Sequence, residues 1–488
     1  MNRKSDDKKP AEKRNKIRGL KSKYRESMGL NFVAAGFCFL FNPIIGVNDF
    51  LPDFIGWLLI LYGLGRLSDL SEDLAFASKQ ARRLLYIGLV RIAVMIIMPS
   101  IEDKGLSLVI TFLSAVFETG LIVLFFGGFF KGLSYLSIRH GGDAAAPDNN
   151  RVKTASGEPP LFARGVNQNI NRVKTASLVF AVMRGAFNLL PELKYLSTSE
   201  YEGEITALAT FDLADYPTAL LVINLVFAGV AGVVWLSLII PWMRRVMADT
   251  AFIRSLQASY DQEIVSNSLL LERRRINFAL IALGLGFGLW TDIFLDGINY
   301  IPDFIGTAFI IVGIYIAAKE LAGANKALKL GVILLPANIL VWALALVLSK
   351  YYTTNVFRSF NTLYLLIALV AAAAAEAGIA GILLLHVSKA LRQLIYEKCG
   401  ELDDERFSRL TERKKKMQTG LYRTLIFFVV SGLIAQLSSV LNYFGLYAWD
   451  WYWLLNAGLQ IVHIFAVVWI FSGIYEQIKI RYDNLRRG

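Results

Sequence analysis

The chain has 488 residues, of which 55% are hydrophobic and 18% are charged, and its mean hydropathy is +0.48. A soluble domain carries about a quarter charged residues, so this composition excludes a disordered chain and an ordinary soluble enzyme, and its 2 cysteines exclude a disulfide scaffold. A net charge of +12 is typical of proteins that bind nucleic acid or anionic lipid, and of membrane proteins with basic cytoplasmic loops. The positions of the basic residues along the chain distinguish these three explanations.

Residues 1–27 form a strongly basic tail with eleven basic and four acidic residues. No hydrophobic core of a cleaved signal peptide lies within it. Beyond this tail, apolar runs long enough to cross about 30 Å of hydrocarbon recur twelve times. They lie near 28–45, 50–69, 84–100, 106–130, 174–191, 216–243, 276–293, 300–318, 329–349, 358–387, 420–441 and 452–474. The sequence therefore predicts an all-α, polytopic integral membrane protein.

The basic residues of the connecting loops predict the orientation. Loops on one side contain only Lys104, Lys194 and Lys350 of the 51 basic residues, whereas the opposite loops hold clusters such as Arg273–Arg275 and Lys414–Lys416. This asymmetry predicts a plasma-membrane protein with both termini in the cytoplasm. We interpret the basic clusters as topology signals and contacts to anionic lipid, because no nucleic-acid motif accompanies them.

Internal repeats suggest that the spans fall into two halves. Pro52–Gly56 recurs as Pro302–Gly306, and Val233–Trp235 recurs as Val467–Trp469. Five further residues recur at an offset of 258: Glu118, Gly120, Lys131, Leu133 and Gly142 match Glu376, Gly378, Lys389, Leu391 and Gly400. We therefore predict two parallel six-helix repeats, related by an axis along the membrane normal.

The repeats give the predicted domain boundaries. The first repeat covers 28–250 and includes a flexible cytoplasmic loop at 139–173, in which Asn150–Ser156 is duplicated. The second repeat covers 276–482. Between them, 251–275 forms a cytoplasmic joint whose mixed apolar and charged residues predict a surface-lying amphipathic helix.

Two glutamates lie within predicted spans, at matching places in the two halves. Glu118 and Glu376 each carry a cost of a few kcal/mol unless they are protonated, paired or hydrated. We expect both to face the interior and to take part in coupling or in a substrate path. Arg91 and Arg184 are available partners in the first half only. The alternative is a structural role, in which the acids hold neighbouring helices together.

Oxygen-bearing side chains also recur, at an offset of 250, around the hairpin between the first two spans of each half. They are Asn42, Asp49 and Asp53 in the first half and Asp292, Asn299 and Asp303 in the second. Hard cations prefer such ligands. An acid after a proline in the first helical turn is also an ordinary helix start, and we favour that interpretation. Gly56 and Gly63, with their counterparts Gly306 and Gly313, predict close helix packing.

No nucleotide-binding loop, metalloprotease motif or nucleophile elbow is present, so we expect no enzymatic activity, no cofactor and no metal. The ground plan of twelve spans resembles that of the major facilitator transporters, although their signature loop is not matched by residues 63–69. We expect a proton- or cation-coupled secondary transporter of unspecified substrate. The alternatives are a sensor or assembly factor that does not transport, and a lipid-handling envelope protein.

Overall fold

The structure is a computed structural model in which the chain divides into two compact units. The first comprises Met1–Arg91 and Met98–Ser266, and the second comprises Ile92–Ile97 and Asn267–Gly488. The described residues are 27–41, 44–45, 48–49, 53–97, 104–142, 170–190, 217–266, 268–290, 294–295, 298–299, 302–318, 324–351, 360–399, 407–443 and 450–487.

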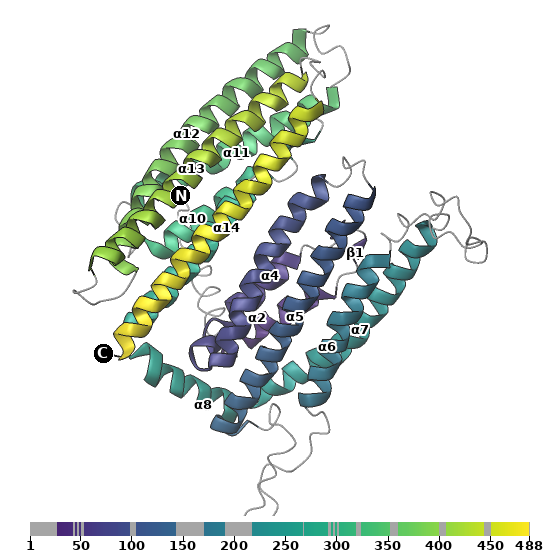
Figure 1. The fold of residues 1–488 in the computed structure, drawn as a ribbon, viewed down its shortest axis with the longest axis vertical. Coiled ribbons are helices and arrows are strands. Elements are labelled where there is room, and N and C mark those ends of the chain that lie inside the picture. The colour runs from purple at the N-terminus through teal and green to yellow at the C-terminus, as the bar shows by residue number, and fades with distance from the viewer. Residues whose placement is uncertain are drawn as a thin grey trace, which may run out of the picture. The chain divides into compact units, whose positions relative to one another are not determined.

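The first unit is helical apart from one small hairpin (Figure 1). Its elements are α2 (Leu30–Leu40), β1 (Ile44–Ile45), β2 (Asn48–Asp49), α3 (Asp53–Leu64), a 3-10 turn (Leu67–Asp69), α4 (Glu72–Ile97), α5 (Lys104–His140), α6 (Ile170–Leu189), α7 (Pro217–Ala248), α8 (Thr250–Tyr260) and a π turn (Asp261–Val265). Aromatic rings fill its core, where Phe37 packs against Phe125, Phe129 and Trp235.

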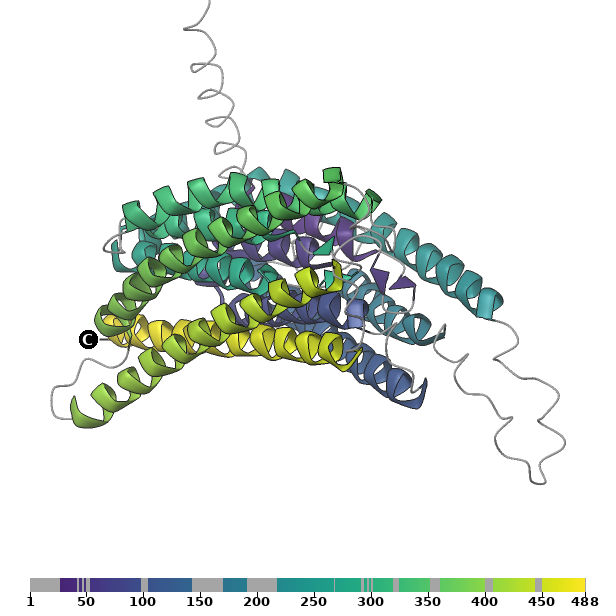
Figure 2. The same ribbon diagram turned by 90° about the horizontal axis from the view of Figure 1, so that it is seen from above.

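The second unit has the same order of elements at its start. It consists of α9 (Ser268–Leu289), β3 (Phe294–Leu295), β4 (Ile298–Asn299), α10 (Asp303–Ala317), α11 (Ala324–Tyr351), α12 (Phe360–Lys398), α13 (Phe407–Tyr443) and α14 (Asp450–Arg487). The long helices α12, α13 and α14 run alongside one another in both views (Figures 1 and 2). Their shared core includes Leu391, Ile395, Leu421 and Ile474.

The first two helices are shorter than the predicted spans. α2 has 11 residues and α3 has 12, so each is roughly 16 to 18 Å long and does not cross about 30 Å of hydrocarbon. Pro43 follows the end of α2, and Pro52 precedes the start of α3. A proline cannot continue a helix, whereas it favours a helix start, so these two positions explain where the helices end and begin.

The hairpins of the two units match in register. Ile44 pairs with Asp49 in the first unit, and Phe294 pairs with Asn299 in the second. Both positions are displaced by 250 residues, as are the starts of α3 at Asp53 and α10 at Asp303.

Glycines bring the helices on either side of each hairpin into backbone contact, which confirms the packing role predicted for them. A Cβ atom at Gly36 would lie 2.6 Å from the carbonyl oxygen of Gly56. A Cβ atom at Gly286 would lie 2.8 Å from the carbonyl oxygen of Gly306. A Cβ atom at Gly63 would lie 2.6 Å from the carbonyl oxygen of Gly29, and a Cβ atom at Gly313 would lie 3.0 Å from the carbonyl oxygen of Ala279. No side chain larger than hydrogen fits these contacts without movement.

The tryptophans of the third sequence match lie in different surroundings. Trp235 is 2% exposed, stacks on Phe180 and donates a hydrogen bond to Ser177, whereas Trp469 is 82% exposed. The Val-Val-Trp recurrence therefore joins a buried tryptophan of α7 to an exposed tryptophan of α14.

Five helices in the described part of the chain are long and apolar enough to cross a membrane. They are Leu108–His140, Thr218–Ala248, Ala324–Leu348, Leu363–Lys398 and Gly458–Tyr482. The apolar helices Leu30–Leu40, Asp53–Leu64 and Asp303–Ala317 are shorter. Helices of this length and composition are compatible with an integral membrane protein.

The joint contains the predicted amphipathic helix, but its apolar side is buried against protein. In α8, Phe252, Ile253, Leu256 and Tyr260 are buried. Phe252 lies directly over Gly142, beyond the end of α5. Arg139 of α5 pairs at 2.9 Å with Glu263 in the π turn that follows α8, so this part of the joint is fastened to α5.

Candidate functional site

Glu118 lies near the centre of the apolar stretch of α5. The stretch is bounded by Lys104 and Lys131, which are 14 and 13 residues away. At 1.5 Å per residue, Glu118 is about 20 Å from either charge. Lys131 forms an exposed ion pair with Asp73 at 2.9 Å, as expected for a side chain at the aqueous end of a span.

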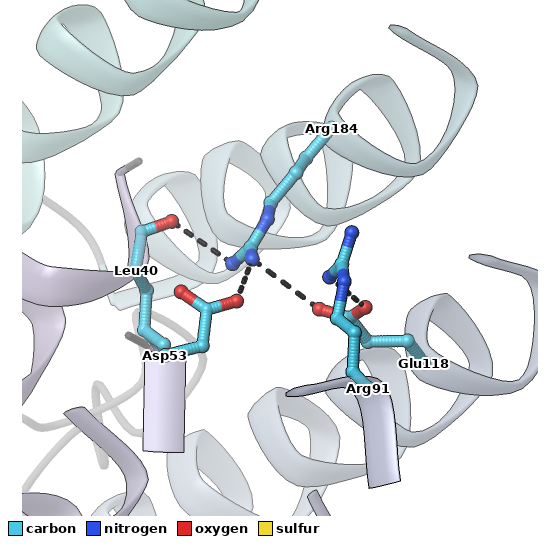
Figure 3. Close-up of polar contacts among 5 residues, drawn as sticks. All are labelled: Leu40, Asp53, Arg91, Glu118 and Arg184. Carbon is cyan, nitrogen blue, oxygen red and sulfur yellow. Dashed lines mark hydrogen bonds and ion pairs between the residues drawn. The ribbon is translucent and has the colours of Figure 1, made fainter. Parts of the chain in front are cut away.

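Two arginines meet Glu118 (Figure 3). Arg91, from α4, donates to one carboxylate oxygen at 2.8 Å, and Arg184, from α6, donates to the other at 3.2 Å. Both arginines are partners predicted for this acid from the sequence, and the structure places both beside it.

Arg184 also joins α6 to α2 and α3, the two short helices on either side of the hairpin. Its guanidinium donates to the carbonyl oxygen of Leu40 at 3.0 Å and forms an ion pair with Asp53 (Figure 3). Leu40 is the last residue of α2, and Asp53 is the first of α3. A helix end leaves carbonyl groups unbonded, and an acid in the first turn complements the helix dipole. One guanidinium therefore caps the carboxyl end of α2, pairs with the first residue of α3 and binds Glu118.

The charges of this group cancel. Asp53 and Arg184 are each 3% exposed and Glu118 is 9% exposed, and with Arg91 they make two cations and two anions. Removing one member of a buried ion pair leaves an uncompensated charge and costs about 3 to 5 kcal/mol. We call Asp53, Arg91, Glu118 and Arg184 the ionic network.

The buried side of α6 extends the polar character beyond the network. Ser177, Arg184 and Asn188 are all buried and are spaced by seven and four residues, which places them on one helix face. Ser177 accepts a hydrogen bond from the indole of Trp235 at 2.9 Å. The Oδ1 atom of Asn188 has no hydrogen-bond partner among the described residues. A polar strip thus runs along α6 through the network.

Sequence reasoning missed Asn188 and the Leu40 carbonyl. The signal for Asn188 is its four-residue spacing from Arg184 within one predicted span. No side-chain pattern points to the Leu40 carbonyl, because that contact depends on α2 ending at this residue.

The predicted oxygen cluster is only partly within the described residues. Asn42 and Asp292 lie outside them, and Asp49 and Asn299 are described as strand residues. Asp53 lies in the ionic network and pairs with Arg184, so in the first unit its carboxylate already has a cation. Within the described part of the chain, no group of three or more His, Cys, Asp and Glu side chains is placed to hold a metal ion.

The second unit presents a different polar group at the start of its second helix. Asn338 of α11 donates to the hydroxyl of Thr307 on α10 at 3.2 Å, and both are buried. Glu376 lies on α12 and is 4% exposed. The position 250 residues before Thr307 is the apolar Trp57, so the two units differ in chemistry where their folds correspond.

Comparisons with protein-family models, with characterised proteins and with solved structures gave no match. The ionic network and the helices that hold it are therefore the features that bear on function.

Proposed function

We propose that the chain is a twelve-helix protein of the cytoplasmic membrane, built from two six-helix repeats with both termini inside, and that it is a proton- or cation-coupled secondary transporter. Two observations support the repeats: the order helix, hairpin, helix opens both units, and the hairpins agree in register at an offset of 250 residues. The basic residues of the loops support the orientation.

One observation carries the transport proposal. The short helices α2 and α3 lie on either side of a hairpin, and the ends that flank it contact the buried ionic network. α3 covers the 12 residues Asp53–Leu64, a length of about 18 Å. Its first residue, Asp53, shares the guanidinium of Arg184 with Glu118, so α3 begins beside the centre of the apolar stretch of α5. Non-helical backbone at membrane depth is tolerated where it is buried in protein or lines a water-filled cavity. Helix ends at mid-membrane form the substrate and ion sites of many secondary transporters.

Sharing of Arg184 provides a mechanism for coupling. Arg184 binds Glu118 on α5 and, independently, Asp53 and the Leu40 carbonyl at the helix break. A proton or a cation on Glu118 would weaken its bond to Arg184, while Arg184 would keep its bonds to the helix break. α5 would then separate from α3 more easily, so occupancy of one carboxylate selects between two arrangements of these helices. Substrate binding to one arrangement would complete the coupling.

Water access to the network tests this proposal. In a Cys38→Ser background, an Asn188→Cys variant should react with a small cationic methanethiosulfonate in native membranes, because the polar strip forms part of the path. A Val226→Cys variant on the exposed apolar side of α7 should not react. In the Asn188→Cys protein, the additional substitution Glu118→Gln should change the rate of the methanethiosulfonate reaction severalfold. An Asn188→Cys variant that stays unreactive at every pH would contradict the proposal.

A second candidate is a sensor or assembly factor that does not transport, with a structural network. All four charges are compensated within one unit. A network that only holds helices together needs no more than this compensation, and this favours the second candidate. Under this alternative, Glu118→Gln lowers thermal stability and leaves Asn188→Cys unreactive. The two candidates therefore predict opposite labelling results.

A further inference from the structure

Basic and aromatic side chains alternate along the seam between α12 and α13 in the second unit. Lys414 of α13 lies over the ring of Tyr396 at 5.6 Å and donates to the carbonyl oxygen of Tyr396 at 2.9 Å. One turn away, Arg392 of α12 lies over the ring of Tyr422 at 4.5 Å. The side chain of Gln418 ties the two levels together by donating to the Arg392 carbonyl at 3.1 Å. We call Arg392, Tyr396, Lys414 and Tyr422 the seam cluster.

The cations of the seam cluster have no acidic partner in the described residues. Neither Lys414 nor Arg392 forms an ion pair there, and the Nε atom of Arg392 is buried without a hydrogen-bond partner. Burial lowers the pKa of Lys414, and repulsion by Arg481 of α14 lowers that pKa further. Positive charge is therefore concentrated between three helices, where an anion would be stabilised.

The seam continues as an exposed apolar strip. Tyr422, Ile426 and Val430 follow one another at four-residue spacing on α13, and all three are exposed. On α12, Leu385 lies seven residues before Arg392 and is also exposed. Because Lys414 precedes the predicted span 420–441, we expect the cations at the cytoplasmic interface and the apolar strip within the hydrocarbon. Aromatic rings at this level are typical of membrane interfaces.

We propose that this seam is a binding site for an anionic phospholipid, with the phosphate between Lys414 and Arg392 and an acyl chain along Tyr422, Ile426 and Val430. Arg392 and Tyr396 lie one turn apart on α12, roughly 6 Å, and Lys414 and Tyr422 lie two turns apart on α13, roughly 12 Å, so both cations belong to one short stretch of the seam. The apolar strip favours a lipid over a soluble phosphate, because a free anion leaves that strip without a partner. Basic pockets between helices on the cytoplasmic side bind such headgroups. The site is independent of the proposed transport function.

Native mass spectrometry of the purified full-length protein tests the site. The protein is delipidated in detergent and titrated with phosphatidylglycerol or with phosphatidylcholine of the same acyl chains. Lys414→Gln combined with Arg392→Gln should weaken phosphatidylglycerol binding roughly thirtyfold, and Lys414→Gln alone roughly fivefold. The matched control is Lys415→Gln combined with Lys416→Gln, which removes equal charge from the exposed side of the same helix and should change binding less than twofold.

Three results would overturn the proposal. They are an equal loss of binding in the control variant, equal binding of the two lipids by the wild type, and displacement of phosphatidylglycerol by millimolar inorganic phosphate. The last result would indicate a soluble anion site instead.

A second measurement locates the acyl chain. Phosphatidylglycerol carrying a diazirine on its acyl chain should label the peptide that contains residues 422–430, and the label should fall at least fivefold in Lys414→Gln. If the double variant does not fold, this labelling of the single variant decides the question. Labelling elsewhere, or labelling that Lys414→Gln leaves unchanged, would refute the site.

Discussion

Arg184 is the residue on which the first unit depends most. It is nearly fully buried and binds groups from α2, α3 and α5. From the sequence, an arginine inside an apolar span predicts a buried partner, and Glu118 is the acid in the nearest predicted span. The link to Asp53 could not be predicted, because the sequence analysis placed Asp53 at the outer surface, at the end of a full-length span.

Replacing Arg184 should therefore be costly. Arg184→Gln leaves Asp53 buried without a cation and should lower the free energy of unfolding by about 3 to 5 kcal/mol. Asp53→Asn combined with Arg184→Gln should cost less than the sum of the two single variants, since no charge is then left alone. Thermal unfolding of the four proteins in detergent measures this coupling. Strict additivity would show that the ion pair is absent.

Cys399 provides a pH-dependent prediction at the same scale. It follows α12 and is buried, and burial raises the pKa of its thiol from 9.0 to about 12, against the opposing effect of Lys414 and Arg481. Above pH 9 the thiol ionises in the unfolded chain but not in the folded one, so folding stability falls between pH 9 and 12. A Cys399→Ala variant should lose less stability over this interval. Parallel unfolding curves at pH 8 and pH 10.5 test this, and an equal loss in both proteins would count against it.

Helix breaks were the part of the fold that the sequence predicted least well. The apolar pattern predicts helices at 28–45 and 50–69, but it does not distinguish a full span from a half-length helix, because both are uniformly apolar. Pro43 and Pro52 are the local signals for the break. The glycine positions were predicted correctly, since Gly56 and Gly306 sit at backbone contacts.

The glycine contacts should be intolerant of even one methyl group. Gly286→Ala places a Cβ atom 2.8 Å from the Gly306 carbonyl oxygen, so α9 and α10 must separate, at a cost of about 1 to 3 kcal/mol. Gly381→Ala on α12 is the matched control, because nothing lies within 4 Å of the added atom. It should be neutral or stabilising by up to about 1 kcal/mol. Thermal unfolding compares the two, and equal shifts would show that α9 and α10 are not in contact.

At the scale of the whole molecule, the distribution of basic residues predicts the topology. Residues Arg151 and Lys415 should face the cytoplasm, and Glu202 should face outward. Half-length helices leave this prediction intact, because two helices that enter and leave on one side do not change the orientation of later spans. An impermeant thiol reagent should label Glu202→Cys and not Arg151→Cys in intact cells. The reverse pattern would invert the topology.

Uptake of protons into proteoliposomes tests the central claim most directly. Vesicles containing the protein and an internal pH-sensitive dye are exposed in turn to pools of amino acids, sugars, organic acids and inorganic ions. Wild-type protein should acidify the vesicle interior with at least one pool. Glu118→Gln, which keeps the size and hydrogen bonding of the side chain, should abolish the response in vesicles that contain the folded variant. A response in both proteins, or in neither, would contradict proton coupling through Glu118 and favour a structural role for the ionic network.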